Sequence, residues 1–308
     1  MGPLMNWKIK ANLQRMCAAL PASETIYYLL QSNLGVFRKA PDPMPNLRDA
    51  AGVLAELPFP ITGKRVMEVG TGRRVDMPLA YYLAGAASTD TVDLYRYLRP
   101  ELVLRSARNI LANAGEIRTL YSPFSDVSAI DERLARLAQV TTFEELSAAT
   151  GIRYHAPADA RHTSLPAASI DLHFSYTVFE HIPGDVLTGI LVEARRVLRP
   201  GTGIACHHID MSDHFVQVDH SISKVNFLRY EDREWAKYND NQFAYHNRLR
   251  ARDYEQIYRD AGHEIVKRID WIDEPSVEAI KTGFPLAQRY RGTDPVQLAT
   301  VGMRVYSR

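Results

Sequence analysis

A short apolar segment followed by two glycines constrains this chain most strongly: Arg65-Val-Met-Glu-Val-Gly-Thr-Gly-Arg73. Its apolar residues form the near-continuous run that is typical of a buried parallel strand. Gly70 and Gly72 then allow a tight turn and a close approach of the backbone to a ligand. Residues 77–84 are typical of a helix. Strand, glycine turn and helix in this order predict the nucleotide-binding half of a doubly wound α/β sheet, where ligands bind beyond the carboxyl ends of the strands.

The glycine pattern argues against a nicotinamide dinucleotide as the cofactor. The dinucleotide fingerprint G-x-G-x-x-G requires a third glycine, and this chain has Val75 at that position. Glu68 instead stands two residues before the first glycine. The resulting Glu-x-Gly-x-Gly resembles the first motif of the class I S-adenosylmethionine-dependent methyltransferases. A carboxylate suits the ammonium and sulfonium groups of that cofactor, whereas it would repel a pyrophosphate.

Further segments resemble the other motifs of this family, and they occur in the order that its fold requires. Asp93 ends an expected second strand about 20 residues beyond the glycines, where an acidic side chain can accept both ribose hydroxyls. In the family, the Asp-Ala pair that ends the third strand, here expected over 152–160, meets the adenine edge. Residues 169–182 resemble the fourth strand and its turn, and 194–203 resemble the glycine turn before the fifth strand. The resemblance therefore implies the following cofactor-binding residues: Glu68, Gly70, Thr71, Gly72, Asp93, Asp159, Ala160 and Ser175.

The resemblance covers roughly residues 64–208 and implies a fold. We expect a seven-stranded, mostly parallel, Rossmann-like sheet with N-terminal helices and an insertion rich in helix and aromatic residues after the fifth strand, 204–210. The last two strands are expected at 264–271 and 299–306, as an antiparallel hairpin. We predict an N-terminal helical cap at 1–60 and a methyltransferase domain at 61–308, with 211–250 as a substrate lid.

Helices are expected at 13–20, 25–34 and 47–57, ahead of the first strand. In methyltransferases such helices often close over the cofactor. The sequence is equally consistent with helices that cover a sheet edge or pair two subunits. A homodimer therefore remains an alternative.

The predicted lid, 211–250, is much longer than usual connections between a strand and a helix, which favours a functional role. It is rich in aromatic and histidine side chains. Apolar walls with a few polar tips suit a polyhydroxylated or ring-bearing small substrate. The alternative is that these aromatic residues pack the core of a helical cap.

Two histidines are candidates for the catalytic base that a hydroxyl acceptor requires. His181 is the first, because its Glu-His pair resembles the turn of the ubiquinone- and menaquinone-biosynthesis type, methyltransferase type 11, in which the histidine lies near the methyl group. The alternative is that its imidazole caps a helix or bonds a backbone carbonyl. His208 is the second. Strand alternation places His208 and Asp210 on one face and His207 on the other.

A divalent metal is a less favoured alternative, and no metal ligands are predicted. Several side chains could gather around an ion, because they follow strands at one edge of the sheet: Glu180, His181, His208, Asp210, Asp213 and His214. Neighbours such as Glu180 and His181 would diverge on a helix, however. Thr177 also stands where metal-dependent relatives offer a carboxylate.

Composition limits the partners. A net charge of +1 argues against a nucleic-acid groove, and no apolar run reaches the length of a membrane span. Without the pattern of a secretion signal, the expected compartment is the cytoplasm.

We therefore expect an S-adenosylmethionine-dependent methyltransferase of a small molecule, most simply an O-methyltransferase of a hydroxylated acceptor such as a sugar or natural product. An N- or C-methyltransferase and a catalytically silent cofactor-binding scaffold are the alternatives.

Overall fold

The computed structural model describes residues 5–20, 23–24, 28, 42–241 and 243–308. The chain forms two compact units. Unit 1 contains residues 1–38, 176–191 and 207–307, and unit 2 contains 39–175, 192–206 and residue 308. The predicted division into a cap at 1–60 and a domain at 61–308 stays a prediction.

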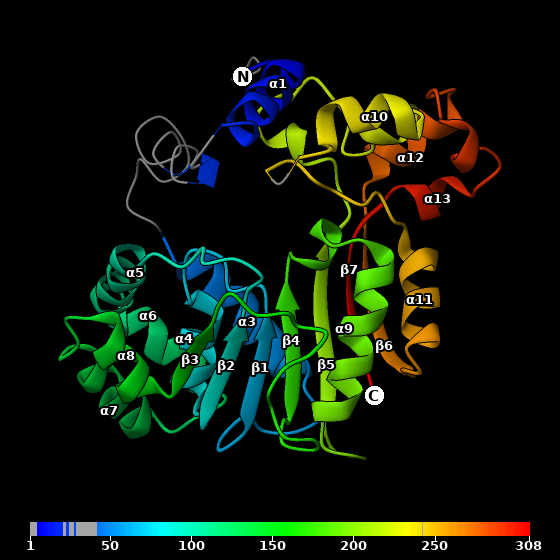
Figure 1. Ribbon diagram of the computed structural model, residues 1–308. Coiled ribbons are helices and arrows are strands. Elements are labelled where there is room, and N and C mark those ends of the chain that lie inside the picture. The colour runs from blue at the N-terminus through cyan, green and yellow to red at the C-terminus, as the bar shows by residue number, and fades with distance from the viewer. Residues whose placement is uncertain (1–4, 21–22, 25–27, 29–41, 242) are drawn as a thin grey trace. The chain divides into compact units, whose positions relative to one another are not determined.

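Seven strands in the described part of the chain form one sheet, in the order β3-β2-β1-β4-β5-β7-β6 (Figure 1). Strand β1 pairs in parallel with β2 and with β4, whereas β6 and β7 pair antiparallel. The predicted Rossmann-like sheet with a terminal hairpin is therefore confirmed. The strands are β1 (Arg65–Val69), β2 (Ser88–Val92), β3 (Ile152–His155), β4 (Leu172–Tyr176), β5 (Ile204–Asp210), β6 (Ile265–Ile272) and β7 (Thr300–Ser307).

The first strand and helix of unit 2 are buried, as their composition predicts. Val66 and Met67 of β1 are fully buried, and so is nearly every side chain of the helix α4 (Asp76–Ala84). Gly85 ends α4 with a left-handed backbone, φ 104°, which glycine adopts without a steric penalty. The helix α3 (Met44–Glu56) packs on α4. Four further helices of unit 2 gather beside β3 (Figure 1): α5 (Pro100–Ala112), α6 (Ala114–Tyr121), α7 (Val127–Leu137) and α8 (Phe143–Thr150).

Unit 1 has an aromatic core that includes the N-terminal helix α1 (Trp7–Ala18). Trp7 is 4% exposed, and its ring lies 4.8 Å from that of Tyr238 and 5.3 Å from that of Phe215. The Trp7 N–H also donates to the Asp219 carboxylate at 3.0 Å. Much of the aromatic content of the predicted lid thus packs against α1, which was the alternative open in the sequence.

The remaining helical segments lie between residues 179 and 298. They are η1 (Phe179–His181), α9 (Gly184–Val197), η2 (His214–Gln217), η3 (Asn226–Arg229), α10 (Asp232–Asn239), α11 (Ala251–Asp260), α12 (Glu274–Lys281), η4 (Gln288–Tyr290) and α13 (Pro295–Leu298).

Some boundaries differ from those expected. The third strand ends at His155 rather than at Ala160, because Pro157 has no N–H to donate to a neighbouring strand. The first helix begins at Trp7, where Asn6 caps it by accepting from the Lys8 N–H. The helix expected at 25–34 lies, apart from Tyr28, outside the described residues.

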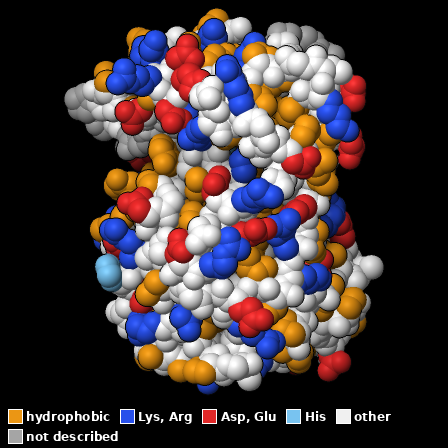
Figure 2. Space-filling model, turned by 90° about the vertical axis from the view of Figure 1, so that its right-hand side faces the viewer, with side chains coloured by type: hydrophobic (Ala, Val, Ile, Leu, Met, Phe, Trp, Pro, Cys, Tyr) orange, Lys and Arg blue, Asp and Glu red, His pale blue; other side chains and the backbone are white. Residues whose placement is uncertain are grey.

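Figure 2 shows one face of the molecule, on which basic and acidic side chains are interspersed. No large field of a single sign gathers on this face. Among the residues that the structure describes, no helix combines the length and the apolar character that crossing a bilayer requires.

We expect Trp7→Ala to lower the free energy of unfolding by about 3–5 kcal/mol, because it leaves a cavity among packed aromatic rings. Urea unfolding followed by tryptophan fluorescence and circular dichroism would measure the loss. Ile9→Ala on the same helix is the control, since Ile9 is 54% exposed and its truncation should cost no more than about 0.5 kcal/mol. Equal losses in the two variants would contradict the packing of α1 in this core.

Candidate functional site

In unit 2, Glu68 sits at one end of a buried chain of hydrogen bonds. The register of β1 with β2 places Glu68 beside Thr91. The Thr91 hydroxyl donates to a Glu68 carboxylate oxygen at 2.5 Å, and the hydroxyls of Thr71 and Thr91 also lie 2.5 Å apart. Burial raises the pKa of Glu68 to about 8, against the hydrogen bond from Thr91, which lowers it. The carboxyl group is therefore poised to gain charge when a cation approaches.

The glycine turn joins the end of β1 to the end of β2. Gly70 and Gly72 both have positive φ, 86° and 64°, which other residues adopt only with strain. The Gly70 N–H donates to the Val92 carbonyl at 2.8 Å, and the Gly72 N–H donates to the Asp93 carboxylate at 2.9 Å. Burial raises the pKa of Asp93 to about 7. The structure thus brings Glu68, Thr71, Gly72 and Asp93 together, as expected.

The segment after β3 lies against the same end of β2. The Asp93 N–H donates to the His155 carbonyl at 3.0 Å, and the Asp93 carbonyl accepts from the Ala158 N–H at 2.9 Å. Asp159 and Ala160 follow directly. Both carboxylate oxygens of Asp159 accept from Arg161, at 2.7–3.1 Å, so a ligand that uses this carboxylate would share it with the guanidinium.

Ser175 is buried near the carboxyl end of β4, and its hydroxyl has no hydrogen-bond partner among the described residues. Such an orphaned group is uncommon in a folded protein. The structure therefore leaves this hydroxyl available within unit 2, and its predicted contact with the cofactor stays a prediction. Thr91 is the residue that the sequence motifs missed, because only the strand register identifies it as the partner of Glu68.

In unit 1, the turn η1 presents Glu180 and His181, and Asn247 holds it in place. The Asn247 side-chain amide donates to the carbonyls of Phe179 and Ile182, each at 2.8 Å. The Asn247 N–H donates to the Glu180 carbonyl, also at 2.8 Å. Two of these bonds satisfy the carbonyls of Glu180 and Ile182, and the third adds to the Phe179 carbonyl, which also accepts from the Ile182 N–H at 3.2 Å. No pattern in the sequence singled out Asn247, because it acts through a fold contact across 65–68 positions.

His181 has a defined ring orientation. Its Nδ1 lies 2.7 Å from the Tyr245 carbonyl, which can only accept, so Nδ1 carries the proton and Nε2 holds a lone pair. The enclosing protein and His214 lower the pKa of His181 to about 4, although the side chain keeps an exposed edge. A neutral imidazole of this kind is a good ligand and hydrogen-bond acceptor, but a weak base.

The two histidines of β5 face opposite sides, which confirms the predicted alternation. His207 is fully buried, with Nδ1 2.5 Å from the Tyr258 hydroxyl. His208 is half-buried, and its ring lies between those of Tyr176 and Trp271, at 4.8 and 5.0 Å. His208 shares its face of the strand with Asp210.

Asp210 connects β5 to a group of histidines. Burial alone would raise the pKa of Asp210, but the hydrogen bond and charge of His214 hold it well below its ordinary range. The His214 Nε2 lies 3.4 Å from the Asp210 carboxylate. The His214 ring lies 4.9 Å from that of His181 and 4.8 Å from that of His246.

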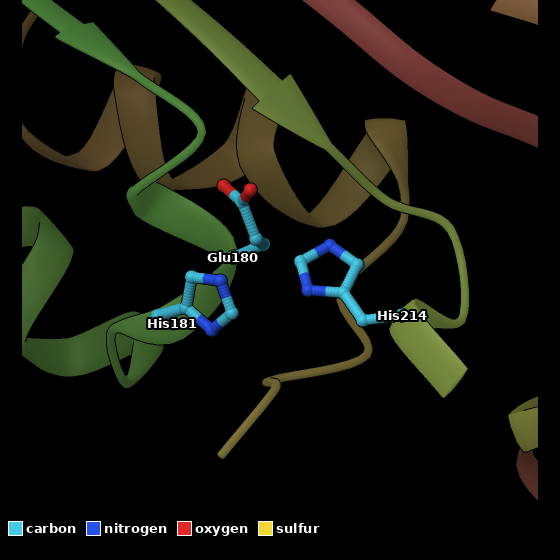
Figure 3. A group of neighbouring side chains, drawn as sticks. All are labelled: Glu180, His181 and His214. Atoms are coloured by element: carbon cyan, nitrogen blue, oxygen red, sulfur yellow. The ribbon is translucent and has the colours of Figure 1, made fainter. Parts of the chain in front are cut away.

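Glu180, His181 and His214 form a compact cluster in unit 1 (Figure 3). One potential donor atom from each lies within 4.8 Å of the other two. Glu180 is fully buried, and neither of its carboxylate oxygens has a hydrogen-bond partner among the described residues. Burial raises the pKa of Glu180 well above its usual range.

A pocket of about 160 Å³ adjoins this cluster within unit 1. Its polar side chains come from α1, from η1, from η2 and the preceding Asp213, and from His246, while phenylalanine and tryptophan side chains form its apolar part. The lining residues are Lys10, Gln14, His181, Asp213, His214, Phe215, Gln217, Phe227, Trp235, Phe243, Ala244 and His246. The predicted substrate lid therefore contributes both an aromatic core and the lining of a pocket.

Residues 115–206 match a family model described as a methyltransferase domain. This range holds Asp159, Ser175 and His181 but begins after the glycine turn. The match agrees with the predicted resemblance to methyltransferases over this part of the chain. No curated protein matches the chain in sequence.

Solved structures of similar fold include three methyltransferases. One, an S-adenosylmethionine-dependent methyltransferase from Mesorhizobium loti, is 16% identical with a TM-score of 0.46, over 85% of this chain and 99% of that one. An S-adenosylmethionine-dependent methyltransferase from Methanosarcina mazei is 13% identical with a TM-score of 0.46, over 83% and 95%. A geranyl diphosphate C-methyltransferase from Streptomyces coelicolor A3(2) is 13% identical with a TM-score of 0.44, over 84% and 79%.

We expect the free energy of unfolding of the unliganded protein to fall as the pH rises from about 4.5 towards about 8. Glu68 holds its proton more tightly in the folded state than in the unfolded chain, so ionisation favours unfolding over this range. Glu68→Gln should make the decline shallower, by at most about 1.4 kcal/mol for each pH unit. Urea midpoints between about pH 5 and pH 8 measure it.

Glu264→Gln provides the control, because Glu264 is an exposed glutamate of unit 1. Its stability profile should follow the wild type. A Glu68→Gln profile with the wild-type slope would show that this carboxyl group is ionised across the whole range.

Proposed function

We propose, on the premise that this chain carries a methyltransferase domain, that it transfers the methyl group of S-adenosylmethionine to a hydroxyl oxygen of a small, ring-bearing acceptor. The observation that carries the choice of acceptor is the pocket in unit 1, which combines aromatic walls with imidazole groups.

The donor is assigned to the carboxylates of unit 2. The ammonium and sulfonium groups of the donor would favour the ionised form of Glu68, whose burial otherwise holds it protonated. Asp93 would accept the ribose hydroxyls while the Gly72 N–H keeps its carboxylate in place. Asp159 and Ala160 would meet the adenine edge, since their segment is tied to the backbone of Asp93. Ser175 has a hydroxyl with no partner to offer the same ligand.

The size and lining of the pocket support a small acceptor. A cavity of about 150 Å³ is large enough to hold benzene, so the 160 Å³ pocket suits a single ring. Phe215, Phe227 and Trp235 supply apolar walls, while Lys10 and Asp213 supply polar groups for the ring substituents. The rest of the lining is mainly polar, so the acceptor ring would carry hydrogen-bonding substituents.

Methyl transfer to oxygen requires an aligned acceptor and removal of its proton. We assign proton removal to His208, which the half-buried face of β5 presents beside Tyr176. His181 was the first candidate from the sequence, but its surroundings lower its pKa to about 4, so its imidazole is a weak base at neutral pH. We assign it instead to contact with the acceptor, through the lone pair on Nε2 that the Tyr245 carbonyl leaves available.

We expect Asp93→Ala to weaken binding of S-adenosylmethionine by about 10- to 100-fold, because two charge-assisted hydrogen bonds to the ribose are lost. Isothermal calorimetry would measure the affinity. Asp131→Ala is a matched control in unit 2, since Asp131 pairs with Arg118 at the surface and should leave the affinity unchanged. If wild type and Asp93→Ala give the same affinity, Asp93 does not hold the ribose.

We expect His208→Ala to lower kcat by about 10²- to 10⁴-fold while the affinity for S-adenosylmethionine stays unchanged, because the acceptor proton loses its base. Labelled methyl donor and product analysis would measure turnover and identify the methylated atom. His208→Phe keeps a ring between Tyr176 and Trp271 and should be equally impaired. Full activity of His208→Phe would mean that the ring only packs, and a methylated nitrogen or carbon in the product would overturn O-methylation.

A further inference from the structure

We propose that Glu180, His181 and His214 bind a divalent transition-metal ion such as Zn²⁺ at the wall of the unit 1 pocket. This metal site is independent of the proposed methyl transfer, because the argument for metal binding uses only these three side chains. It also reverses the preference drawn from the sequence, in which neighbouring residues on a helix were expected to diverge.

The turn η1 explains how two sequence neighbours come to share a site. Glu180 and His181 lie on a single tight turn that the Asn247 side chain holds, rather than on a regular helix. His214 joins them from η2 (Figure 3). Donor atoms of all three lie within 4.8 Å of one another.

The charge of Glu180 is the strongest reason to expect a ligand. This side chain is fully buried and both of its oxygens are without a hydrogen-bond partner in the described structure. Burial of an unpaired carboxylate is costly, and buried charges are normally paired or coordinate metals.

The two imidazoles are oriented as metal ligands usually are. Metal-binding histidines commonly donate their second ring N–H to a carbonyl or a carboxylate. The Nδ1 of His181 lies 2.7 Å from the Tyr245 carbonyl, which leaves Nε2 for the ion. The Nε2 of His214 lies 3.4 Å from the Asp210 carboxylate, which leaves Nδ1 for the ion.

The donor set selects the kind of ion. Two imidazoles and one carboxylate suit Zn²⁺ and other first-row transition ions, whereas Mg²⁺ prefers oxygen ligands alone. Bonds of about 2.1 Å at tetrahedral angles place donors about 3.4 Å apart, so binding would draw donor atoms that now lie within 4.8 Å together by up to about 1.4 Å. Both His181 and His214 line the pocket, and three protein ligands leave a position open on that side.

An ion there would have a use in the pocket. A divalent ion lowers the pKa of a bound hydroxyl and fixes its position. This consequence rests on the proposed function, whereas binding of the ion does not. With the ion bound, the Nε2 lone pair of His181 would be held by the metal, so His181 would act on the acceptor through the ion rather than directly, and proton removal would remain with His208.

The test is metal binding by the full chain. The protein is first freed of metal with a chelator, and neither the methyl donor nor the methyl acceptor is added. We expect Zn²⁺ to bind in calorimetry with one ion per chain, and Co²⁺ to give a visible absorption band of an imidazole-bound ion. Glu180→Gln and His214→Ala should each weaken Zn²⁺ binding by at least about 100-fold. His208→Ala should keep Zn²⁺ affinity although it lowers turnover. Mg²⁺ should give no comparable heat.

His220→Ala is the control, because His220 is an exposed histidine in the same connection and is not one of the three clustered residues. Glu180→Gln replaces an unpartnered carboxyl group by an amide of the same size, so circular dichroism should show a folded protein. The proposal is overturned if the wild type binds no Zn²⁺, or if Glu180→Gln and His214→Ala bind it as the wild type does. Binding of S-adenosylmethionine is measured separately, so failure of the metal site and failure of the methyltransferase assignment are distinguishable.

Discussion

The cost of burying carboxylates shapes both halves of this protein. At the end of β1, Glu68 lies in the interior and depends on Thr91 for a hydrogen bond, and Asp93 depends on the Gly72 N–H. A carboxyl group so placed is held near the point of ionisation, which makes it responsive to a cationic ligand. The glycine turn is required because only a positive φ brings the Gly72 N–H to the Asp93 carboxylate.

The same physical cost appears in unit 1 with a different outcome. There Glu180 is buried without a partner, while Asn247 satisfies the carbonyls of the turn that carries it. Two oriented imidazoles stand beside the carboxyl group. The aromatic side chains of α1 and of the lid segment, 211–250, pack together. Several of them also line the pocket that we assign to the acceptor. Polar groups are therefore concentrated where a ligand can compensate for their burial.

Local patterns predicted the strand, glycine turn and helix of unit 2 well, because these residues lie within short segments. The apolar run, the two glycines and Asp93 belong to consecutive elements, and strand alternation alone placed His207 and His208 on opposite faces. Thr91, Asn247 and the Tyr245 carbonyl escaped prediction because each acts on a residue distant in sequence. The sequence argument placed Glu180 and His181 on a regular helix, on which they would diverge, whereas the chain forms a single tight turn there.

The sequence by itself determined the sheet and the glycine turn, since hydrophobic periodicity and short motifs act over neighbouring residues. Only the tertiary structure decided which side chains are buried without partners and which nitrogen of His181 is left with its lone pair. Those properties arise from contacts between remote segments, and burial and hydrogen bonding set the charge and direction of a group only after the chain has folded.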